Sequence, residues 1–586
     1  MNVTPPSGVL RLVRSPFSPA TPAGETACYV LQGNAAEAVV REIVVDPESG
    51  FPGRPAHLDA QPFRLEILHF NDLHGNLACF GQEHYEAVFS RLAGLIRRRR
   101  RQLAGEPGAG LLVLGGGDDL VGGLFELLQD DQVTDTPVHA AYRLYTAAGV
   151  DAVTLGNHDL DRGLRYLEAR QRAEARFPVL SANLIDLDPP GEDFFYPAAI
   201  LVTRGVRVGL VGLTTPGERI PQKRVDFRLT DQAAAARHIL PALRPWCDVL
   251  LLLTHLGDSI ASSSAVLVGP GDCELAAQLP PGSVDLIVGA HTHQALNEGG
   301  LSARNVVNGV PVLQAGAYGR FIGEATLHLA PRPVLTSARL WPVAGLPVDE
   351  KFEAQHVRPL SRRLARLAAQ ELGPVAPEPS LSTPSQRNAF AGGESALGNF
   401  VADAMAACCR AAGCPVDFAA LDSSALHAGF PPGGTLTLGD LFQAVPFMDQ
   451  ILVCQVDAVQ LAALLEDNAR RLDPPAEPHV ERGFAHFSRE IRYTIQGTHA
   501  REITLGGEPL DALSGRMYSL ALTNLFHHFA RPWEEAAGVR PLPWQGFPWQ
   551  PSGIRLRDGL LAYIREQHGV PAAGGARLDG RLKVVS

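Results

Sequence analysis

The stretch TLGNHDLDRG, residues 154–163, decides how the first half of the chain is interpreted. An apolar run from Val150 to Leu155 stops at Gly156, and polar residues follow at once: Asn157, His158, Asp159 and Asp161. A strand that ends in this way places polar side chains at the carboxyl edge of a sheet, where open α/β folds bind their ligands. Because Gly, Asn and Asp are also the usual residues of turns, a turn without further function is the alternative.

Similar apolar runs lie on both sides of this stretch. From Phe63 to about Leu346, short β-rich runs alternate with helical stretches, and the runs begin at residues 63, 110, 151, 177, 206, 248, 284 and 310. Repeated alternation of strands and helices predicts a layered α/β domain, which we place at residues 63–348.

The flanking segments differ in composition. Residues 1–62 are rich in Pro, Gly, Ser and Thr around two short apolar patches, and they predict an N-terminal extension of unknown role with a few strands. Residues 349–385 combine a helical pattern with a Pro-rich joint, so we expect a helical linker and hinge there. Residues 386–586 predict a second α/β domain, which opens with the helical stretch SALGNFVADAMAACC.

Composition excludes some classes of partner. The 586 residues are 46% hydrophobic and 19% charged, which is an ordinary balance for a globular protein. A formal net charge of -11 argues against general binding to nucleic acid or to an anionic membrane, so we expect neither partner. The basic run Arg97–Arg101 follows an amphipathic segment, which predicts a solvated helix C-terminus, where cations offset the helix dipole.

The sequence as written contains no recognisable export or membrane segment. Its first residues lack the apolar core of about 7–15 residues that a secretory signal needs. No run approaches the roughly 18 apolar residues of a membrane span. The eight cysteines form no CxxC pair, and most lie in apolar surroundings, which favours reduced thiols. We therefore expect a cytoplasmic location, or a periplasmic one if the true start lies upstream.

Residues with metal-binding side chains follow five of the apolar runs. They are Asp72, His74, Asp118, Asn157, His255, His291 and His293. Imidazole nitrogens and carboxylate oxygens together suit divalent transition metals, and one carboxylate can bridge two ions. Two such ions activate a water and hold a phosphoryl oxygen in the hydrolysis of phosphate esters. A single histidine in such a chain is more often a core or surface residue, which is our interpretation of His69.

These motifs resemble those of a known family. In order, NDLHGN, GGDDLVGG, GNHDLDRG, LLLTHLGD and GAHTHQ are similar to the calcineurin-like metallophosphatases, specifically the 5′-nucleotidase and UDP-sugar hydrolase group. The later motifs SALGNFVADAM and TLTLGDLFQAVPFMDQ resemble that group's substrate domain. The resemblance covers residues 63–586. It implies an α/β metallophosphatase domain of two sheets flanked by helices, followed by a C-terminal α/β substrate-binding domain.

The resemblance also implies roles for the metal-binding residues. It assigns one ion to Asp72, His74, Asp118 and His293, and a second to Asp118, Asn157, His255 and His291, so that Asp118 bridges them. The ions would be divalent Mn, Zn, Fe or Co. His158 would stabilise developing charge or protonate the leaving oxygen, and Asp161 would fix its tautomer and raise its pKa. We give Asp159 no role beyond the turn.

The second domain departs from the family pattern. In DSSALH, Asp422 stands where the family has an amide, and His427 stands where it has a phosphate-binding arginine. One aromatic residue for stacking on a nucleobase, Phe447, is in place. The loop of the second aromatic residue is replaced by a stretch after Asn524 whose rings either rebuild an aromatic wall or simply pack: Phe526, Phe529, Trp533, Trp544, Phe547 and Trp549.

The sequence therefore predicts a dinuclear metal-dependent phosphoesterase of the 5′-nucleotidase type. Its substrate would be a small phosphate mono- or diester resembling a nucleotide, and the reaction would be attack by a metal-bound hydroxide. One alternative is a thiosulfohydrolase-like or other non-nucleotide hydrolase on the same scaffold. The other is a non-catalytic scaffold protein that binds metal. The sequence predicts no oligomeric state.

Overall fold

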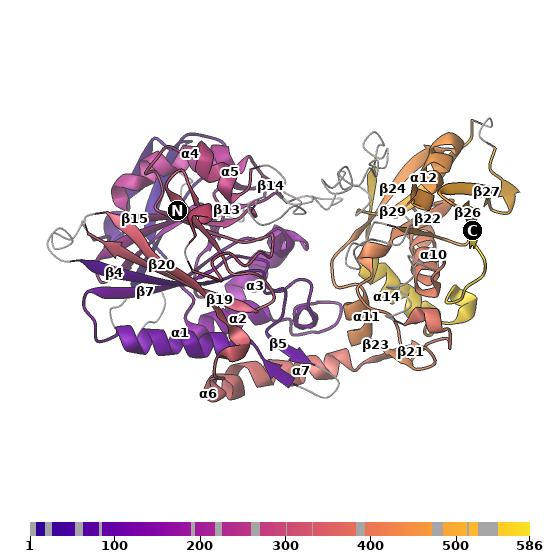
Figure 1. Ribbon diagram of the computed structural model, residues 1–586, viewed down its shortest axis with the longest axis horizontal. Helices are drawn as coiled ribbons and strands as arrows, with labels where there is room; N and C mark the ends of the chain where they lie inside the picture. Colours follow the sequence, from indigo (N-terminus) through magenta and orange to yellow (C-terminus); the bar gives the residue numbers. More distant parts are fainter. Residues whose placement is uncertain are drawn as a thin grey trace. The chain divides into compact units, whose positions relative to one another are not determined.

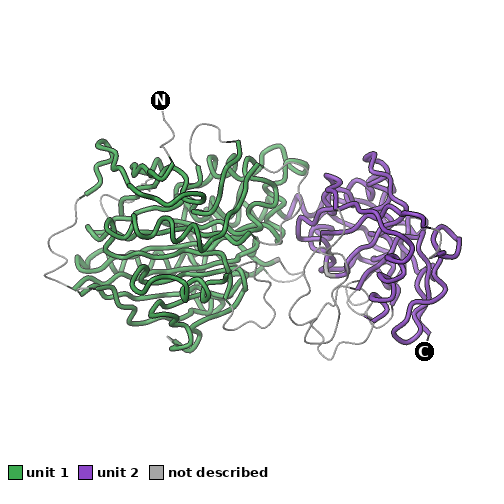
Figure 2. Tube along the Cα trace, turned by 90° about the horizontal axis from the view of Figure 1, so that it is seen from above, with its two compact units in different colours: residues 1–218, 225–364 green, residues 219–224, 365–586 purple. Residues whose placement is uncertain are grey.

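The chain divides into two compact units. The computed structural model describes residues 7–17, 26–52, 62–80, 85–188, 194–216, 226–258, 270–300, 302–330, 332–382, 393–470, 484–511, 515–524 and 549–585. Unit 1 comprises residues 1–218 and 225–364, and unit 2 comprises residues 219–224 and 365–586 (Figure 2).

Unit 1 is built on two large sheets. The nine-stranded sheet has the order β17 (Val306–Val307), β18 (Val310–Gln314), β16 (Leu286–Gly289), β15 (Val249–His255), β13 (Val206–Thr214), β12 (Ala198–Thr203), β2 (Thr26–Gln32), β1 (Val9–Arg14) and β3 (Glu42–Val45). The seven-stranded sheet has the order β11 (Phe195–Tyr196), β9 (Val179–Leu180), β8 (Ala152–Thr154), β7 (Ala109–Gly115), β4 (Phe63–Phe70), β19 (Phe321–Leu329) and β20 (Pro333–Pro342). Smaller pairs are β5 (Ala78–Phe80) with β6 (Tyr85–Ala87) and β10 (Leu184–Asp186) with β14 (Phe227–Leu229).

The two sheets pack face to face, with helices on their outer faces. Strand β15 is buried on both sides: Leu251 and Leu253 lie in the core between the sheets, whereas Leu250 and Leu252 face the helices. A strand covered on both faces is expected to be continuously apolar, as VLLLLTH is. The helices of unit 1 are α1 (Phe89–Leu103), α2 (Ala140–Ala148), α3 (Leu164–Glu174), α4 (Gln232–Leu243) and α5 (Asp272–Gln278). Figure 1 shows α4 and α5 on one side of the sheets and α1 on the other, so the predicted layered α/β fold is confirmed.

The N-terminal segment is part of the first unit. Strand β2 pairs with β12, and β1 lies between β2 and β3 at the edge of the nine-stranded sheet. Leu10, Leu12 and Leu31 contribute to the core beneath the helices. Residues 1–62, which the sequence assigns to an extension of unknown role, thus supply three strands to the nine-stranded sheet.

The basic run lies in the last turns of α1, so the predicted helix C-terminus is confirmed, but the expectation that the run is simply solvated is wrong. Three of its arginines are bound by carboxylates within unit 1: Arg97 by Asp349 at 2.7 Å, Arg99 by Glu324 at 2.6 Å and Arg100 by Asp151 at 3.0 Å. These arginines therefore join α1 to neighbouring elements.

A helical segment leads into unit 2. It consists of α6 (Glu350–Phe352), a π-helical turn (Glu353–Val357) and α7 (Arg358–Ala368). Strand β21 (Glu371–Pro374) follows and pairs with β23 (Thr435–Thr437).

Unit 2 has a five-stranded and a four-stranded sheet. The first has the order β25 (Ala485–Phe487), β22 (Phe418–Asp422), β29 (Met517–Thr523), β24 (Gln450–Asp457) and β30 (Gln550–Arg555). The second has the order β28 (Glu508–Pro509), β27 (His499–Leu505), β26 (Ile491–Gln496) and β31 (Leu582–Val585). The helices are α10 (Ala396–Ala411), α11 (Leu438–Ala444), α12 (Ala458–Arg470) and α14 (Leu556–Glu566). Among the described residues, no helix is both long and apolar enough to cross a membrane.

Candidate metal centre

The carboxyl ends of parallel strands bring the predicted metal ligands together. Strands β4, β7 and β8 are parallel neighbours in the seven-stranded sheet, and β15 and β16 are parallel neighbours in the nine-stranded sheet. The ligands lie on the last residue of these strands or just after it: Asp72 and His74 after β4, Asp118 after β7, Asn157 after β8, His255 ending β15, and His291 and His293 after β16. The arrangement follows from side-by-side parallel strands, whose carboxyl ends share one edge.

Six of these residues form two compact groups of three. Asp72, His74 and His293 make one group, and the ligand atoms they offer all lie within 4.8 Å of one another. Asp118, His255 and His291 make a second group that meets the same limit.

Asp118 lies between the two groups. Its Oδ2 is 3.1 Å from Nε2 of His255 in its own group and 3.9 Å from Nε2 of His74 in the other. Asp72 of the first group also approaches the second group, since its Oδ1 is 3.8 Å from Nε2 of His255. One carboxylate within reach of both sets of imidazoles is the geometry that a bridging ligand needs.

Several buried polar atoms at this edge make no hydrogen bond of ordinary geometry to any described residue. They are Oδ1 of Asp72, Oδ1 of Asn157 and Nε2 of His255. A buried polar atom without a partner costs free energy unless something else satisfies it. Two carboxylates, one amide oxygen and four imidazoles suit divalent transition metals, so the residues fit the two ions that the family implies.

The surroundings of the histidines orient them for metal binding. Nδ1 of His74 lies 2.8 Å from the Val121 carbonyl, and Nδ1 of His255 lies 2.7 Å from the Gly116 carbonyl. A carbonyl oxygen can only accept, so each Nδ1 carries a proton and Nε2 is the nitrogen left to bind a metal.

The ligands are held in an uncommon backbone conformation. Eleven described residues other than glycine have a positive φ, and five of them are predicted ligands: Asp72, His74, Asp118, His291 and His293. Such conformations are unfavourable for residues with a side chain, and they cluster at functional sites where the surrounding structure enforces them.

At two nearby glycines there is no space for a side chain. A Cβ on Gly156 would lie 2.0 Å from Oδ1 of Asp118, and one on Gly289 would lie 2.0 Å from Oδ2 of Asp272. Neither glycine has a positive φ. Glycine is required at both positions because a side chain would not fit there.

The electrostatics of the edge favour bound cations. Burial alone would raise the pKa of Asp72, but His255 and His293 outweigh it and lower that pKa to about 2. Burial would likewise lower the pKa of His255, but Asp118 and Asp72 raise it to about 10. The two ionised carboxylates thus require positive charge beside them, which a divalent ion supplies more fully than a proton.

The predicted acid pair lies directly beside the ligands. Nδ1 of His158 is 2.9 Å from Oδ2 of Asp161, and the backbone N–H of His158 donates to Oδ1 of Asp118 at 2.9 Å. Burial raises the pKa of Asp161, and the nearby His158 opposes this increase. The side chain of His158 is 28% exposed, whereas that of Asp161 is 6% exposed, so the imidazole is reached from solvent and its partner is not.

Sequence reasoning missed two positioning residues. Asp159 accepts the backbone N–H groups of Gly156 at 2.9 Å, Asp118 at 3.0 Å and Asp119 at 3.2 Å, so it ties two ligand-bearing loops together. Asn71 donates to Oδ2 of Asp72 at 2.6 Å and accepts the N–H of Ala315 at 2.9 Å. Both residues adjoin a predicted functional residue in the sequence, but only tertiary structure shows their partners.

The predicted substrate residues lie in unit 2. His427 and Phe447 are neighbours, with ring centroids 5.3 Å apart in an edge-to-face arrangement. Asp422 ends β22 and is 5% exposed. Of the six rings considered for an aromatic wall, Trp549 packs against a core cluster of unit 2 and the other five lie outside the described residues.

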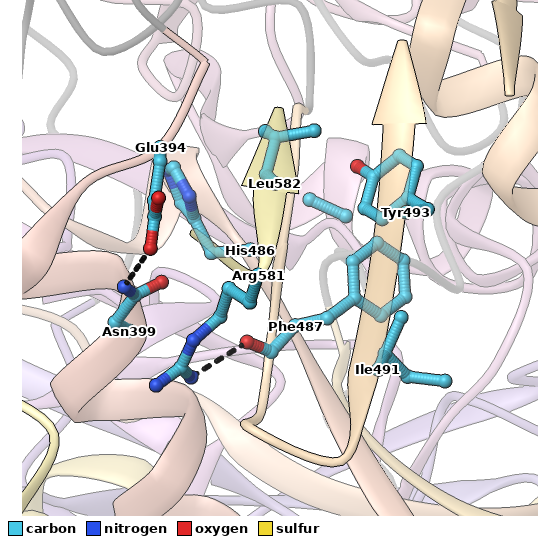
Figure 3. A pocket seen from close by; sticks show the side chains of 9 residues that line it. Glu394, Asn399, His486, Phe487, Ile491, Tyr493, Arg581 and Leu582 are labelled. Carbon is cyan, nitrogen blue, oxygen red and sulfur yellow. Dashed lines mark hydrogen bonds between the residues drawn. The ribbon is translucent and has the colours of Figure 1, made fainter. Parts of the chain in front are cut away.

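Two small cavities lie away from the metal ligands. The cavity in Figure 3 has about 10 Å³ and is lined by residues of unit 2 that include Glu394, His486 and Arg581. The other, also about 10 Å³, lies in unit 1 between Arg100 and Arg204. Each has room for about one water, so neither can hold a nucleotide.

Two family profiles match the chain. The calcineurin-like phosphoesterase profile matches residues 65–295, within unit 1. Unit 1 thus contains a calcineurin-like phosphoesterase domain. The profile of the 5′-nucleotidase C-terminal domain matches residues 374–527, within unit 2. The family and the two-domain α/β fold predicted from the sequence are confirmed.

Individual relatives agree with the family profiles. The chain is 26% identical over 505 residues to Protein UshA of Yersinia enterocolitica, covering 79% of this chain and 85% of that protein. It is 30% identical over 285 residues to Protein UshA of Salmonella pullorum, covering 45% of this chain and about half, 48%, of the relative. A putative 5′-nucleotidase structure from Staphylococcus aureus shares the fold, with a TM-score of 0.65 and 18% identity, covering 89% of this chain and 99% of that one.

Proposed function

We propose that the protein is a dinuclear metal-dependent phosphoesterase that hydrolyses a nucleotide-like phosphate mono- or diester. The observation that carries this proposal is the pair of ligand groups around Asp118, placed beside the His158–Asp161 pair. A structural metal site needs no acid beside it, which argues against the alternative of a non-catalytic scaffold.

Seven residues would hold the two ions. Asp72, His74 and His293 would bind one, and Asn157, His255 and His291 would bind the other, with Asp118 between them. When bound, two divalent ions lower the pKa of a water and polarise a phosphoryl oxygen. The protein itself supplies the carboxylate and imidazole ligands. It buries Asp72, Asp118 and His255, and this burial restricts the access of bulk water to the site.

His158 is the group that handles the leaving oxygen. Because Nδ1 donates to Asp161, Nε2 is the atom that can deliver a proton to the oxygen of the departing alcohol. The carboxylate of Asp161 also stabilises the imidazolium form, which keeps that proton available near neutral pH. Asp161 does not reach the substrate itself; it acts through His158.

Substrate recognition is assigned to unit 2. The match to the 5′-nucleotidase C-terminal domain and the half-buried ring of Phe447 support a substrate with a planar base. His427 lies beside that ring, and an imidazole holds phosphate less firmly than a bidentate arginine. We therefore propose that His427 binds phosphate more weakly than an arginine at this position would.

The test is phosphate release from AMP. The protein is stripped of metal with chelator, refilled with Mn²⁺ and compared with the apo form and with Asp118→Asn. Turnover by the Mn²⁺ form alone supports the proposal. If the wild type cleaves an aryl phosphodiester but not AMP, the metal centre is catalytic and the nucleotide assignment is wrong. If it cleaves neither, the phosphoesterase assignment is wrong.

A further inference from the structure

A buried ion cluster lies next to the acid pair and has no part in the chemistry described so far. Arg162, whose side chain is 5% exposed, donates to Oδ2 of Asp130 at 2.6 Å and to Oε1 of Glu126 at 3.2 Å. Both acids are buried, and Glu126 is completely so. Burial disfavours a charged guanidinium, but Glu126 and Asp130 outweigh it and raise the pKa of Arg162. The guanidinium of Arg162 therefore keeps its charge although it is buried.

The cluster joins two loops that carry functional residues. Glu126 lies in a short 3-10 turn (Leu124–Leu128), and its Oε2 accepts the backbone N–H of Gly122 at 3.3 Å. Gly122 follows Val121, whose carbonyl fixes the ring of His74. At the other end, Arg162 directly follows Asp161. The ion pair between Glu126 and Arg162 thus joins the loop that orients His74 to the loop that carries His158 and Asp161.

Arg162 is also fixed on its other side. Its guanidinium carbon lies 5.1 Å from the ring centroid of Tyr166, and Nη1 donates to the Tyr166 hydroxyl at 3.5 Å. Tyr166 belongs to α3, and its hydroxyl donates to the Gln129 carbonyl. The segment around Glu126, the loop at Arg162 and helix α3 are therefore held in one arrangement.

The energetics of such a cluster point to a geometric role. Taking three charged groups out of water is costly, and their attraction offsets that cost only when the geometry is good. Packing alone would be served as well by apolar residues of similar volume. Hydrogen-bonded ion pairs require a defined geometry, so a cluster of them between two functional loops fixes the position of one loop relative to the other.

We propose that Glu126 and Arg162 are positioning residues for the His158–Asp161 pair. By pinning the backbone immediately after Asp161 to the loop beyond Asp118, they hold the Asp161 carboxylate against Nδ1 of His158 and so hold Nε2 toward the leaving oxygen. The inference rests on the proposed function, because it assigns a means of aiming the acid that this function requires.

The test compares substrates that differ in their need for a proton. The 4-nitrophenolate anion is stable and leaves without protonation, whereas the ribose oxygen of AMP needs a proton as it leaves. General acid catalysis contributes about 100-fold to 10,000-fold. We expect Glu126→Gln to lower kcat for AMP by about 10-fold or more, because the acid is displaced rather than removed. Its kcat for 4-nitrophenyl phosphate and its metal content should change little.

A second variant and a control keep the test decisive. In the wild type, Nη2 of Arg162 bonds to both acids and Nη1 bonds to the Tyr166 hydroxyl. Arg162→Lys keeps the charge but has a single nitrogen that cannot replace both, so it should show the same substrate-dependent loss even if Glu126→Gln folds poorly. Arg143→Met removes an ion pair between α2 and α3, in which Arg143 contacts Glu174 at 2.7 Å and is 47% exposed. This control should leave the ratio of the two substrates unchanged.

The outcomes separate the inference from the proposed function. An equal loss on both substrates, or no loss on either, would overturn the positioning role of Glu126 and Arg162. Failure of the wild type on AMP would overturn the nucleotide assignment. In that case the same comparison between 4-nitrophenyl phosphate and an alkyl phosphate that the wild type does cleave still tests the two residues.

Discussion

Replacing Gly156 by alanine tests how tightly Asp118 is held. The new Cβ would lie 2.0 Å from Oδ1 of Asp118 and 2.5 Å from its backbone nitrogen. Because real Cβ contacts closer than 3.0 Å essentially never occur, the carboxylate must move by about 1 Å or more. A displacement of this size at a reacting centre costs about 100-fold in rate. We therefore expect Gly156→Ala to fold, to bind metal more weakly, and to lose about 100-fold in kcat on 4-nitrophenyl phosphate.

The assay measures turnover, metal content and thermal unfolding together. Gly105→Ala is the matched control, because no atom lies within 4 Å of its added Cβ and its φ is not positive. The control should behave as wild type in all three measurements. If Gly156→Ala keeps both ions and full turnover, Asp118 does not need the position described here, and the steric reasoning is refuted.

Three further predictions concern the acid pair, a buried histidine and the metals. Asp161→Asn should lower kcat on AMP by about 100-fold with less effect on 4-nitrophenyl phosphate, measured by phosphate release. Burial lowers the pKa of His139 to about 3, so below its ordinary value of 6.5 only the unfolded chain takes up the proton. As the pH is lowered from 6.5 to about 3, the free energy of unfolding should therefore fall by about 1.4 kcal/mol per pH unit. His139→Asn, which keeps an acceptor for the Tyr142 N–H, should reduce the slope measured by urea unfolding by this amount; an unchanged slope would contradict the assignment. Removing metal should lower the melting temperature, and Mn²⁺ should restore it in a concentration-dependent way; a melting temperature indifferent to Mn²⁺ would argue against ions bound by the folded state.

The sequence could place the predicted metal ligands at one edge because strand ends are local features. The apolar run before His255 and the glycines before Asn157 and His291 mark where strands stop, and parallel pairing then brings those ends together without further information. A single repeated rule, polar residues directly after an apolar run, picked out the candidate ligands, and the family resemblance divided them between two ions.

The residues that position those ligands could not be predicted in the same way. Asp159 looks like an ordinary turn residue, and its three N–H partners come partly from a loop some forty positions earlier. Glu126 and Arg162 carry no motif, and they meet only because the turn containing Glu126 folds back onto α3. Contacts between distant loops depend on the complete fold, which periodicity does not encode.

The N-terminal segment illustrates a different limit. Its Pro- and Gly-rich composition indicated a loose extension, yet Leu10 and Leu12 are fully buried in strand β1. Short alternating strands give weak signals when their pairing partner lies far along the chain, here β12 at Ala198–Thr203 for the neighbouring β2. Tertiary pairing decided their structure.

The measurement that most directly tests the dinuclear centre is a Mn²⁺ titration of metal-free protein that follows bound ions and turnover together. The two ligand groups predict two ions per chain in the wild type, with turnover appearing only as the second site fills. His293→Ala and His291→Ala, one from each group, should each lose one ion and most of the activity. Full turnover with a single bound ion, or two ions retained by either variant, would contradict the account.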